Sequence, residues 1–360
     1  MSTIPFGNDP NKIARYRAFW QREAVDRPLV GFTLRGWFPL DEYSTTRAWQ
    51  AARYLTPDMV HPEEFLQDEE RLLHEGEIMG DDIIRGDSPA AAVIPWLSAT
   101  IGSPLRILPG SLLGEERTLP WEALENVRLD RVSPWFRKYL AFADALVQLA
   151  QGRFPVSHGA LLGPSDLMAQ LRGHTQSILD LWETHERSSR LLWRLAAMFQ
   201  ETTEAIWERL PLFHGGYFDG MYQLWAPGPI LRLQEDASGV YSPRLYREFL
   251  QPIDRYLAAH FANSFIHLHS TSMFLLDAFL EVEELGCFEI NNDASGPPLE
   301  QMVPYFQMVQ SAGRSLLIRG SFSPDDLRLL LDHLDARGLY LLILVRDLDE
   351  VARLKPILGM

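Results

Sequence analysis

The sequence predicts an α/β protein, and within that class a (β/α)8 TIM barrel with an N-terminal helical extension. From about residue 134, long amphipathic helices alternate with short apolar runs bounded by glycine and proline, which is the strand–helix–strand pattern. About eight such runs follow residue 29, and eight strands close this barrel. A chain of 360 residues fits one such domain, so we expect a single domain over residues 1–360 with a docking helix within 1–27.

The first elements are read from local patterns. Residues 11–25 carry apolar side chains at helical spacing and predict a helix that docks before the barrel. Pro28 ends this helix, because proline disfavours helical backbone at the preceding residue, and the apolar run 29–34 predicts the first strand. A helix is expected at 62–77 and a second strand near 105–108.

The later elements follow the alternating rhythm more clearly. Further helices are predicted at residues 164–172, 183–209 and 243–263. Further strands are predicted at residues 154–162, 230–234, 264–272, 288–291, 316–319 and 339–345. The repeat lies in the architecture, so no repeat in the amino-acid sequence is required.

Composition limits the classes of partner. A formal net charge of −15 disfavours nonspecific binding to nucleic acid or anionic lipid, whose phosphates require a basic surface. A single cysteine, Cys287, excludes an internal disulfide and a cluster of thiolates. We therefore expect a small-molecule substrate, no nucleic acid and no membrane partner, and either a monomer or a homodimer.

The amino-terminal residues lack a basic start followed by an apolar stretch, so no secretory signal is expected. The sequence also contains no apolar run of about 18 residues. Together these features predict a cytoplasmic protein.

Two histidines lie in the strand predicted at 264–272. Side chains alternate between the two faces of a strand, so Phe265, His267 and His269 share one face. In a closed barrel this face points into the lumen and towards the mouth, where active sites of this architecture lie. Three interpretations stay open: a metal-binding pair, an acid–base or substrate-binding pair, and a structural pair.

The residues at and after the strand ends are polar almost throughout, and in a barrel they converge on one mouth. They are Arg35, Gln234, Glu235, Asp236, Asn291, Asn292, Asp293, Arg319 and Arg346. We expect the arginines to hold an anionic group and Asp236 to act as a general base or to face a cationic group. Neighbouring carboxylates would raise the pKa of Asp236. The alternative for Asp236 is a helix cap.

Aromatic residues interrupted by glycines, among them Tyr222, fill residues 213–229. We interpret this cluster as a wall over the mouth of the barrel, or alternatively as packing that holds the loop down.

Five segments resemble, in the same order, motifs of the uroporphyrinogen decarboxylase superfamily, which also includes methyltransferases that serve corrinoid proteins and coenzyme M. They are residues 15–30, 161–168, 235–252, 266–271 and 319–324. The resemblance covers most of the chain and implies a (β/α)8 barrel.

Residues that carry function in the superfamily are mostly replaced here. Where the decarboxylases have two arginines after the first strand, this chain has Arg35 alone, and the superfamily's serine after strand four matches Asp236. Its tyrosine after the third strand matches Gln170. The His-x-Cys zinc motif of the methyltransferases matches His269-Ser270-Thr271, and Cys287 lies on another strand.

The sequence thus favours a metal-independent decarboxylase (a lyase) that acts on a small anionic metabolite without a cofactor. Asp236 and His269 are its predicted catalytic residues. Predicted substrate-binding residues are Arg35, Gln234, His267, Asn292, Arg319, Arg346 and Tyr222.

One alternative is a zinc-dependent methyltransferase with a corrinoid protein as partner, its metal held by His267, His269 and a carboxylate, Asp236 or Glu235. Another is a barrel that binds a ligand without catalysis.

Overall fold

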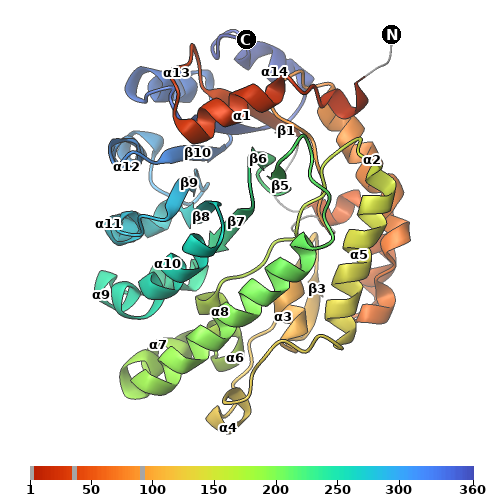
Figure 1. The fold of residues 1–360 in the computed structure, drawn as a ribbon, viewed down its shortest axis with the longest axis vertical. Helices are drawn as coiled ribbons and strands as arrows, with labels where there is room; N and C mark the ends of the chain where they lie inside the picture. Colours follow the sequence, from red (N-terminus) through yellow and green to blue (C-terminus); the bar gives the residue numbers. More distant parts are fainter. Residues whose placement is uncertain (1–3, 35–38, 90–93) are drawn as a thin grey trace.

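The protein has a mixed α/β fold around one parallel sheet (Figure 1). The computed structural model describes residues 4–34, 39–89 and 94–360. Six parallel strands pair in the order β1-β11-β10-β9-β8-β7. Their bounds are β1 Leu29–Leu34, β7 Ile230–Gln234, β8 Asn263–His269, β9 Leu285–Asn291, β10 Ser315–Gly320 and β11 Leu339–Val345.

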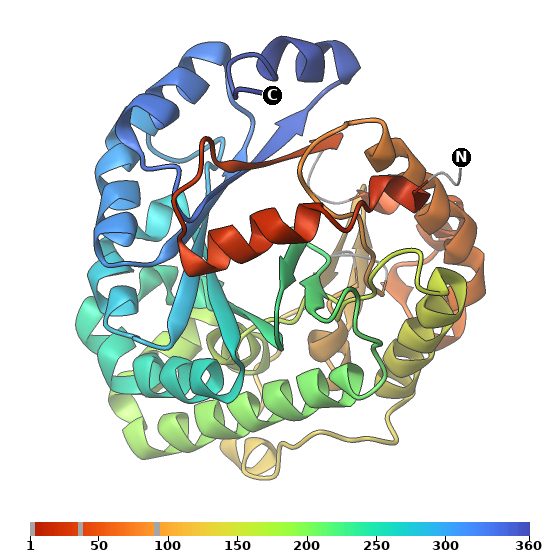
Figure 2. The ribbon, with the colours of Figure 1, turned by 45° about the horizontal axis from the view of Figure 1, so that its top comes forward.

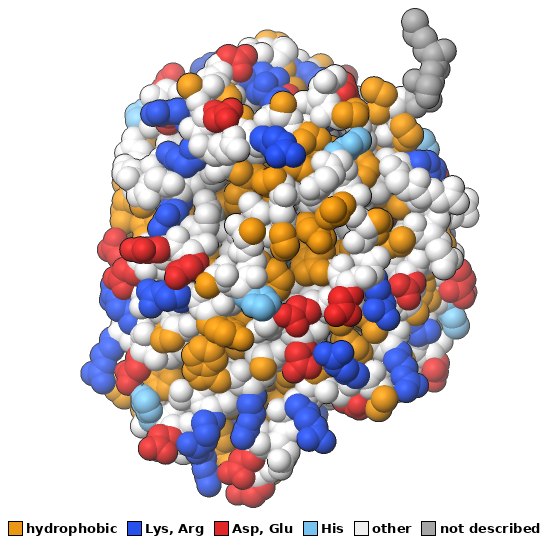
Figure 3. Space-filling view, in the orientation of Figure 1, with side chains coloured by type: hydrophobic (Ala, Val, Ile, Leu, Met, Phe, Trp, Pro, Cys, Tyr) orange, Lys and Arg blue, Asp and Glu red, His pale blue; other side chains and the backbone are white. Residues whose placement is uncertain are grey.

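Helices surround the strands, and α1 crosses the centre of the view in Figure 2. None of the described helices is both long and apolar enough to cross a membrane. On the face in Figure 3, acidic and basic side chains are interspersed around an apolar centre. The helices are α1 Lys12–Gln21, α2 Pro62–Glu77, α3 Trp96–Thr100, α4 Trp121–Leu124, α5 Pro134–Ala150, α6 Pro164–Arg172, α7 His174–Glu183, α8 His185–Trp207, α9 Pro243–Leu245, α10 Gln251–His260, α11 Leu276–Leu280, α12 Leu299–Ser311, α13 Pro324–His333 and α14 Leu348–Leu354.

Two predicted strands differ in part from the structure. Residues 105–108 do form a strand, β3, but it pairs antiparallel with β2 (Tyr54–Leu55) and β4 (Ser111–Gly114) in a separate sheet. The tight turn at Gly110, with φ of 68°, connects β3 directly to β4, and this short connection makes the β3–β4 pairing antiparallel. The predicted strand at 154–162 is reduced to one bridge, between Val156 and Asp87.

Most aromatic side chains of residues 213–229 are buried, which agrees with the interpretation as packing rather than with a wall over the mouth. Strands β5 (Tyr217–Asp219) and β6 (Leu224–Ala226) form a hairpin whose Phe218 and Trp225 are fully buried. Trp225 belongs to an apolar cluster with Leu29, the first residue of β1. The hairpin also contacts α1 and therefore fills the amino-terminal end of the sheet.

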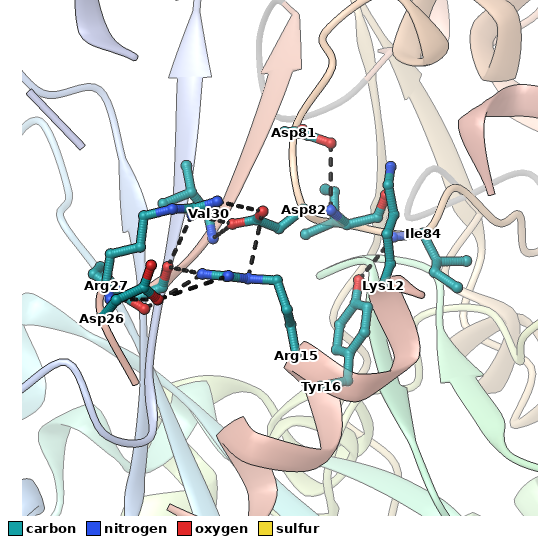
Figure 4. A network of polar contacts seen from close by, with 11 residues as sticks. Lys12, Arg15, Tyr16, Asp26, Arg27, Val30, Asp81, Asp82 and Ile84 are labelled. Carbon is teal, nitrogen blue, oxygen red and sulfur yellow. Dashed lines mark hydrogen bonds and ion pairs between the residues drawn. The ribbon is translucent and has the colours of Figure 1, made fainter. Parts of the chain in front are cut away.

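A polar network fastens α1 to the start of the sheet (Figure 4). The Asp82 carboxylate accepts hydrogen bonds from Arg27 at 2.8 Å and from the backbone N–H of Val30 at 3.0 Å. Arg15 of α1 forms an ion pair with the same carboxylate at 3.4 Å. Since the Asp82 side chain is only 8% exposed, these contacts lie largely out of water.

We expect Asp82→Ala to destabilise the fold by about 3 kcal/mol, because it leaves the Arg27 guanidinium without its partner in a buried setting. Urea denaturation followed by circular dichroism measures this change. The control is Asp26→Ala, whose carboxylate is 81% exposed, and its effect should stay below about 1 kcal/mol. Equal effects of the two substitutions would contradict a buried role for Asp82.

Candidate active site

A cavity of about 400 Å³ lies at the carboxyl ends of β7, β8 and β9. Strand β4, the segment before α6 and Gln170 of α6 line its other side. Such a volume suits a small molecule. The lining residues are Pro95, Ser111, Leu112, Leu113, Gly114, Ala160, Leu162, Gln170, Met221, Arg232, Gln234, Asp236, His267, His269, Asn291 and Asp293.

Asp236, His267 and His269 meet in this cavity. His267 and His269 share one face of β8, and Asp236 starts a short helical turn two residues after the end of β7. The Nε2 atoms of His267 and His269 lie 3.9 Å and 3.7 Å from the Asp236 carboxylate oxygens. One ligand atom from each residue can be chosen so that all three lie within 4.8 Å of one another.

Each histidine is oriented from behind by a second carboxylate. His267 Nδ1 contacts Glu289 of β9, and His269 Nδ1 lies 3.0 Å from Asp293, just after β9. A carboxylate accepts a hydrogen bond, so it holds a proton on Nδ1 and turns Nε2 towards Asp236. This arrangement is typical of histidines that ligate metal.

Tyr222 also supports His267, because the Tyr222 hydroxyl lies 2.8 Å from His267 Nδ1. The Tyr222 side chain is fully buried and is not among the described residues that line the cavity. The structure thus shows a contact of Tyr222 with His267, and its contact with substrate stays a prediction.

The electrostatics of Asp236 differ from the prediction. Burial alone would raise the pKa of Asp236, but the hydrogen bond with His269 and the charges of His267 and His269 outweigh it, so the pKa is lowered. Hydrogen bonds with Asp236 and Asp293 raise the pKa of His269 to about 10. The cationic imidazolium is therefore the stable form of His269 at neutral pH when the site holds nothing else.

Glu235 faces away from the cavity, so it does not provide the alternative metal ligand. Its carboxylate accepts a hydrogen bond from the backbone N–H of Ser165 at 2.8 Å. Burial, followed by the charges of Asp254 and Asp166, raises the pKa of Glu235 well above its usual value. Burial also raises the pKa of Asp254 to about 7.

Other predicted site residues lie in different places. Gln234 lines the cavity and donates to Asp236 at 2.6 Å. Asn292 does not line it, and its neighbour Asn291 does, because successive side chains alternate along the end of β9. The side chain of Arg346 is 77% exposed and pairs with Glu350, so it points away.

The two remaining arginines of the prediction also differ. Arg319 is buried, with its guanidinium carbon 5.9 Å from the centre of the Tyr222 ring, and is not a lining residue. Arg35 lies outside the described residues.

Sequence reasoning missed Arg232 and Glu289. Both lie inside apolar strands, two residues before a strand-end residue that the prediction named, Gln234 and Asn291 respectively. Alternation along the strand would have placed both on the inward face. A charged residue on that face of an apolar strand was the available signal.

The fold and the site together define an α/β protein with a three-residue candidate metal site in a cavity at the carboxyl edge of a parallel sheet. No protein-family model and no curated protein matches the sequence. A solved structure of a methyltransferase from Methanosarcina mazei is similar over 99% of each chain, with a TM-score of 0.64 and 13% sequence identity. At this identity the similarity concerns the fold alone.

Proposed function

We propose that this protein is a metal-dependent methyltransferase related to the uroporphyrinogen decarboxylase superfamily, with a divalent cation, zinc, held by Asp236, His267 and His269. The observation that carries the proposal is the pair of histidines that turn Nε2 towards one carboxylate while Glu289 and Asp293 hold their Nδ1 atoms. The similarity in fold to a methyltransferase supports the choice of reaction.

The donor set fits zinc. Two imidazole nitrogens and one carboxylate oxygen are ligands that catalytic zinc takes, with a fourth position left for substrate. The Nε2 atoms of His269 and His267 lie 3.7 Å and 3.9 Å from the Asp236 carboxylate oxygens. These separations approach the spacing of about 3.4 Å between ligands that each lie about 2.05 Å from a tetrahedral zinc.

Zinc in this position would lower the pKa of a thiol or hydroxyl and so supply a nucleophile that accepts a methyl group. The protein's own residues prepare the site for it. Glu289 and Asp293 fix the histidine tautomers, and Gln234 holds the Asp236 carboxylate at 2.6 Å. Leu112 and Leu113 on the hairpin give the cavity an apolar side.

Metal-independent proton chemistry, including decarboxylation, stays a second candidate on one observation. His269 lies between Asp236 and Asp293, which raise its pKa to about 10. An imidazolium in this position would stabilise an anion that forms in the cavity. Metal content therefore separates the two candidates.

We also propose that the fold closes as a (β/α)8 barrel. Backbone contacts continue beyond the edge of β1, since Asp82 N–H donates to the Val30 carbonyl at 3.0 Å and Asp87 N–H to Pro155 at 3.0 Å. On the other edge, a Cβ on Gly163 would lie 1.8 Å from the Gln234 carbonyl oxygen, so the two backbones are close. Residues 82–87 and 154–158 would be the second and third strands.

The test is an assay of methyl transfer. Zinc-loaded protein is incubated with methylcobalamin and small thiols, and loss of the methylcobalamin absorbance is followed. We expect turnover that requires zinc and stops when a chelator removes it. Release of CO₂ from small carboxylates by metal-free protein would instead replace methyl transfer with decarboxylation.

A further inference from the structure

Arg232 is a buried cation in the wall of the cavity, and part of its guanidinium group has no hydrogen-bond partner. It lies on β7, is 1% exposed and lines the cavity. Its Nη1 contacts the Met221 sulfur at 2.9 Å, and its guanidinium carbon lies 6.0 Å from the centre of the Tyr222 ring. Within the described part of the chain, its Nε and Nη2 have no hydrogen-bond partner.

Two other buried arginines, Arg85 and Arg172, each pair with a carboxylate. Arg85 pairs with Asp81 and also donates to the carbonyl of Phe32 at 3.2 Å. Arg172 pairs with Asp180. Burial of a guanidinium N–H without an acceptor costs free energy, because its hydrogen bond to water is lost and no hydrogen bond within the protein replaces it. The unpartnered donors of Arg232 in the cavity wall therefore indicate a group that binds there.

A second unpartnered polar atom faces the same space. Asn291 lines the cavity and is 1% exposed, and its Oδ1 has no hydrogen-bond partner among the described residues. Gln234 is paired with His267 across β7 and β8, and Arg232 lies two residues before Gln234. A strand rises about 3.3 Å per residue, so Arg232 lies about 7 Å deeper than the level of the histidines.

We propose that Arg232 binds the anionic end of a small substrate, a carboxylate or a sulfonate, whose other end lies at Asp236, His267 and His269. A guanidinium offers paired donors that match the oxygens of either group. Arg232 is the one arginine or lysine among the described lining residues, so we expect the bound end of the substrate to carry a single negative charge. This inference rests on the proposed function insofar as both take this cavity as the substrate site.

Binding of small anions tests the inference. Propionate and methanesulfonate are titrated into zinc-loaded protein by calorimetry, with propionamide as the uncharged analogue of propionate. We expect both anions to bind, the better one identifying the class, and propionamide not to bind. Arg232→Met should weaken anion binding about 30-fold, and Arg232→Lys should weaken it less. Arg346→Met is the control, since Arg346 is exposed, and should bind as the wild type does.

Stability without ligand separates binding from a structural role. If Arg232 serves a ligand, Arg232→Met should melt no lower than the wild type in the absence of anions, because it removes a buried charge without a partner. Anions should raise the melting temperature of the wild type but not of this variant. A variant that melts lower yet binds propionate unchanged would overturn the inference.

Failure of this inference can be told apart from failure of the proposed metal site. Metal content is measured on the same samples, and Arg232→Met should keep its zinc, since Arg232 is not one of the proposed ligands. Protein that carries zinc but binds neither propionate nor methanesulfonate would refute the anion site alone. Metal-free protein whose anion binding depends on Arg232 refutes the metal site and supports the anion site.

Discussion

Protein purified without chelator should carry close to one zinc per chain, and the double variant His267→Ala/His269→Ala should carry almost none. The variant removes two of the three proposed ligands, and the Asp236 carboxylate, which is 35% exposed, cannot retain the ion alone. Elemental mass spectrometry measures the metal. The same variant should lose zinc-dependent methyl transfer completely, which is the largest effect expected of any substitution in the chain.

The matched control is His174→Ala/His185→Ala. Both imidazoles are more than half exposed, and each pairs with a surface glutamate. This variant loses as many histidines as the first and should keep the full metal content. Wild-type protein that carries no metal and cannot be loaded with it would contradict the metal site and leave proton chemistry at His269.

Much of the parallel sheet could be predicted from the sequence, because its strands are apolar runs bounded by strong local signals. The predicted limits of β1, β7 and β11 match the structure, as do those of α2 and α6. The predicted helix at 243–263 is interrupted, since a π-helical turn at Tyr246–Leu250 separates α9 from α10. Nothing in the local apolar pattern marks that turn.

The region between β1 and α5 was harder, because its pairing is decided by contacts distant in sequence. The strand at Leu105–Leu108 has ordinary strand composition, and only its partners assign it to a separate sheet. The aromatic residues near Trp225 illustrate the same limit. Glycine-separated aromatics suit a wall over the mouth as well as packing that holds the loop down, and the contact between Trp225 and Trp20 of α1, more than 200 residues away, favours packing.

The proposed metal ligands could be predicted from the sequence, because strand alternation and strand ends place His267, His269 and Asp236 together at the carboxyl edge of the parallel sheet. Their orientation was not. The carboxylates that hold the imidazoles come from β9 and the loop after it, 22 and 24 residues further along the chain. No spacing rule connects such partners, since their distance in sequence depends on the helix between the strands.

Glu289→Gln should lower the affinity for zinc about 10- to 100-fold while leaving the fold intact. The Glu289 side chain is fully buried and contacts His267 Nδ1, so its charge makes that imidazole a better electron donor and fixes its tautomer. Glutamine has the same shape and can still accept a hydrogen bond, but it lacks the charge. Competition with a chromophoric chelator measures the affinity, and thermal unfolding checks the fold.

Asp293→Asn gives the internal comparison, because it removes the same kind of support from His269. The Asp293 side chain is 18% exposed and that of His269 is 38% exposed, so water can replace part of the lost interaction. We therefore expect a smaller loss of zinc affinity than for Glu289→Gln. Glu350→Gln, at a glutamate that pairs with an exposed arginine, should have no effect. Unchanged affinity in both Glu289→Gln and Asp293→Asn would mean that the histidines do not bind metal through Nε2, because a carboxylate behind a ligating imidazole necessarily tunes its basicity.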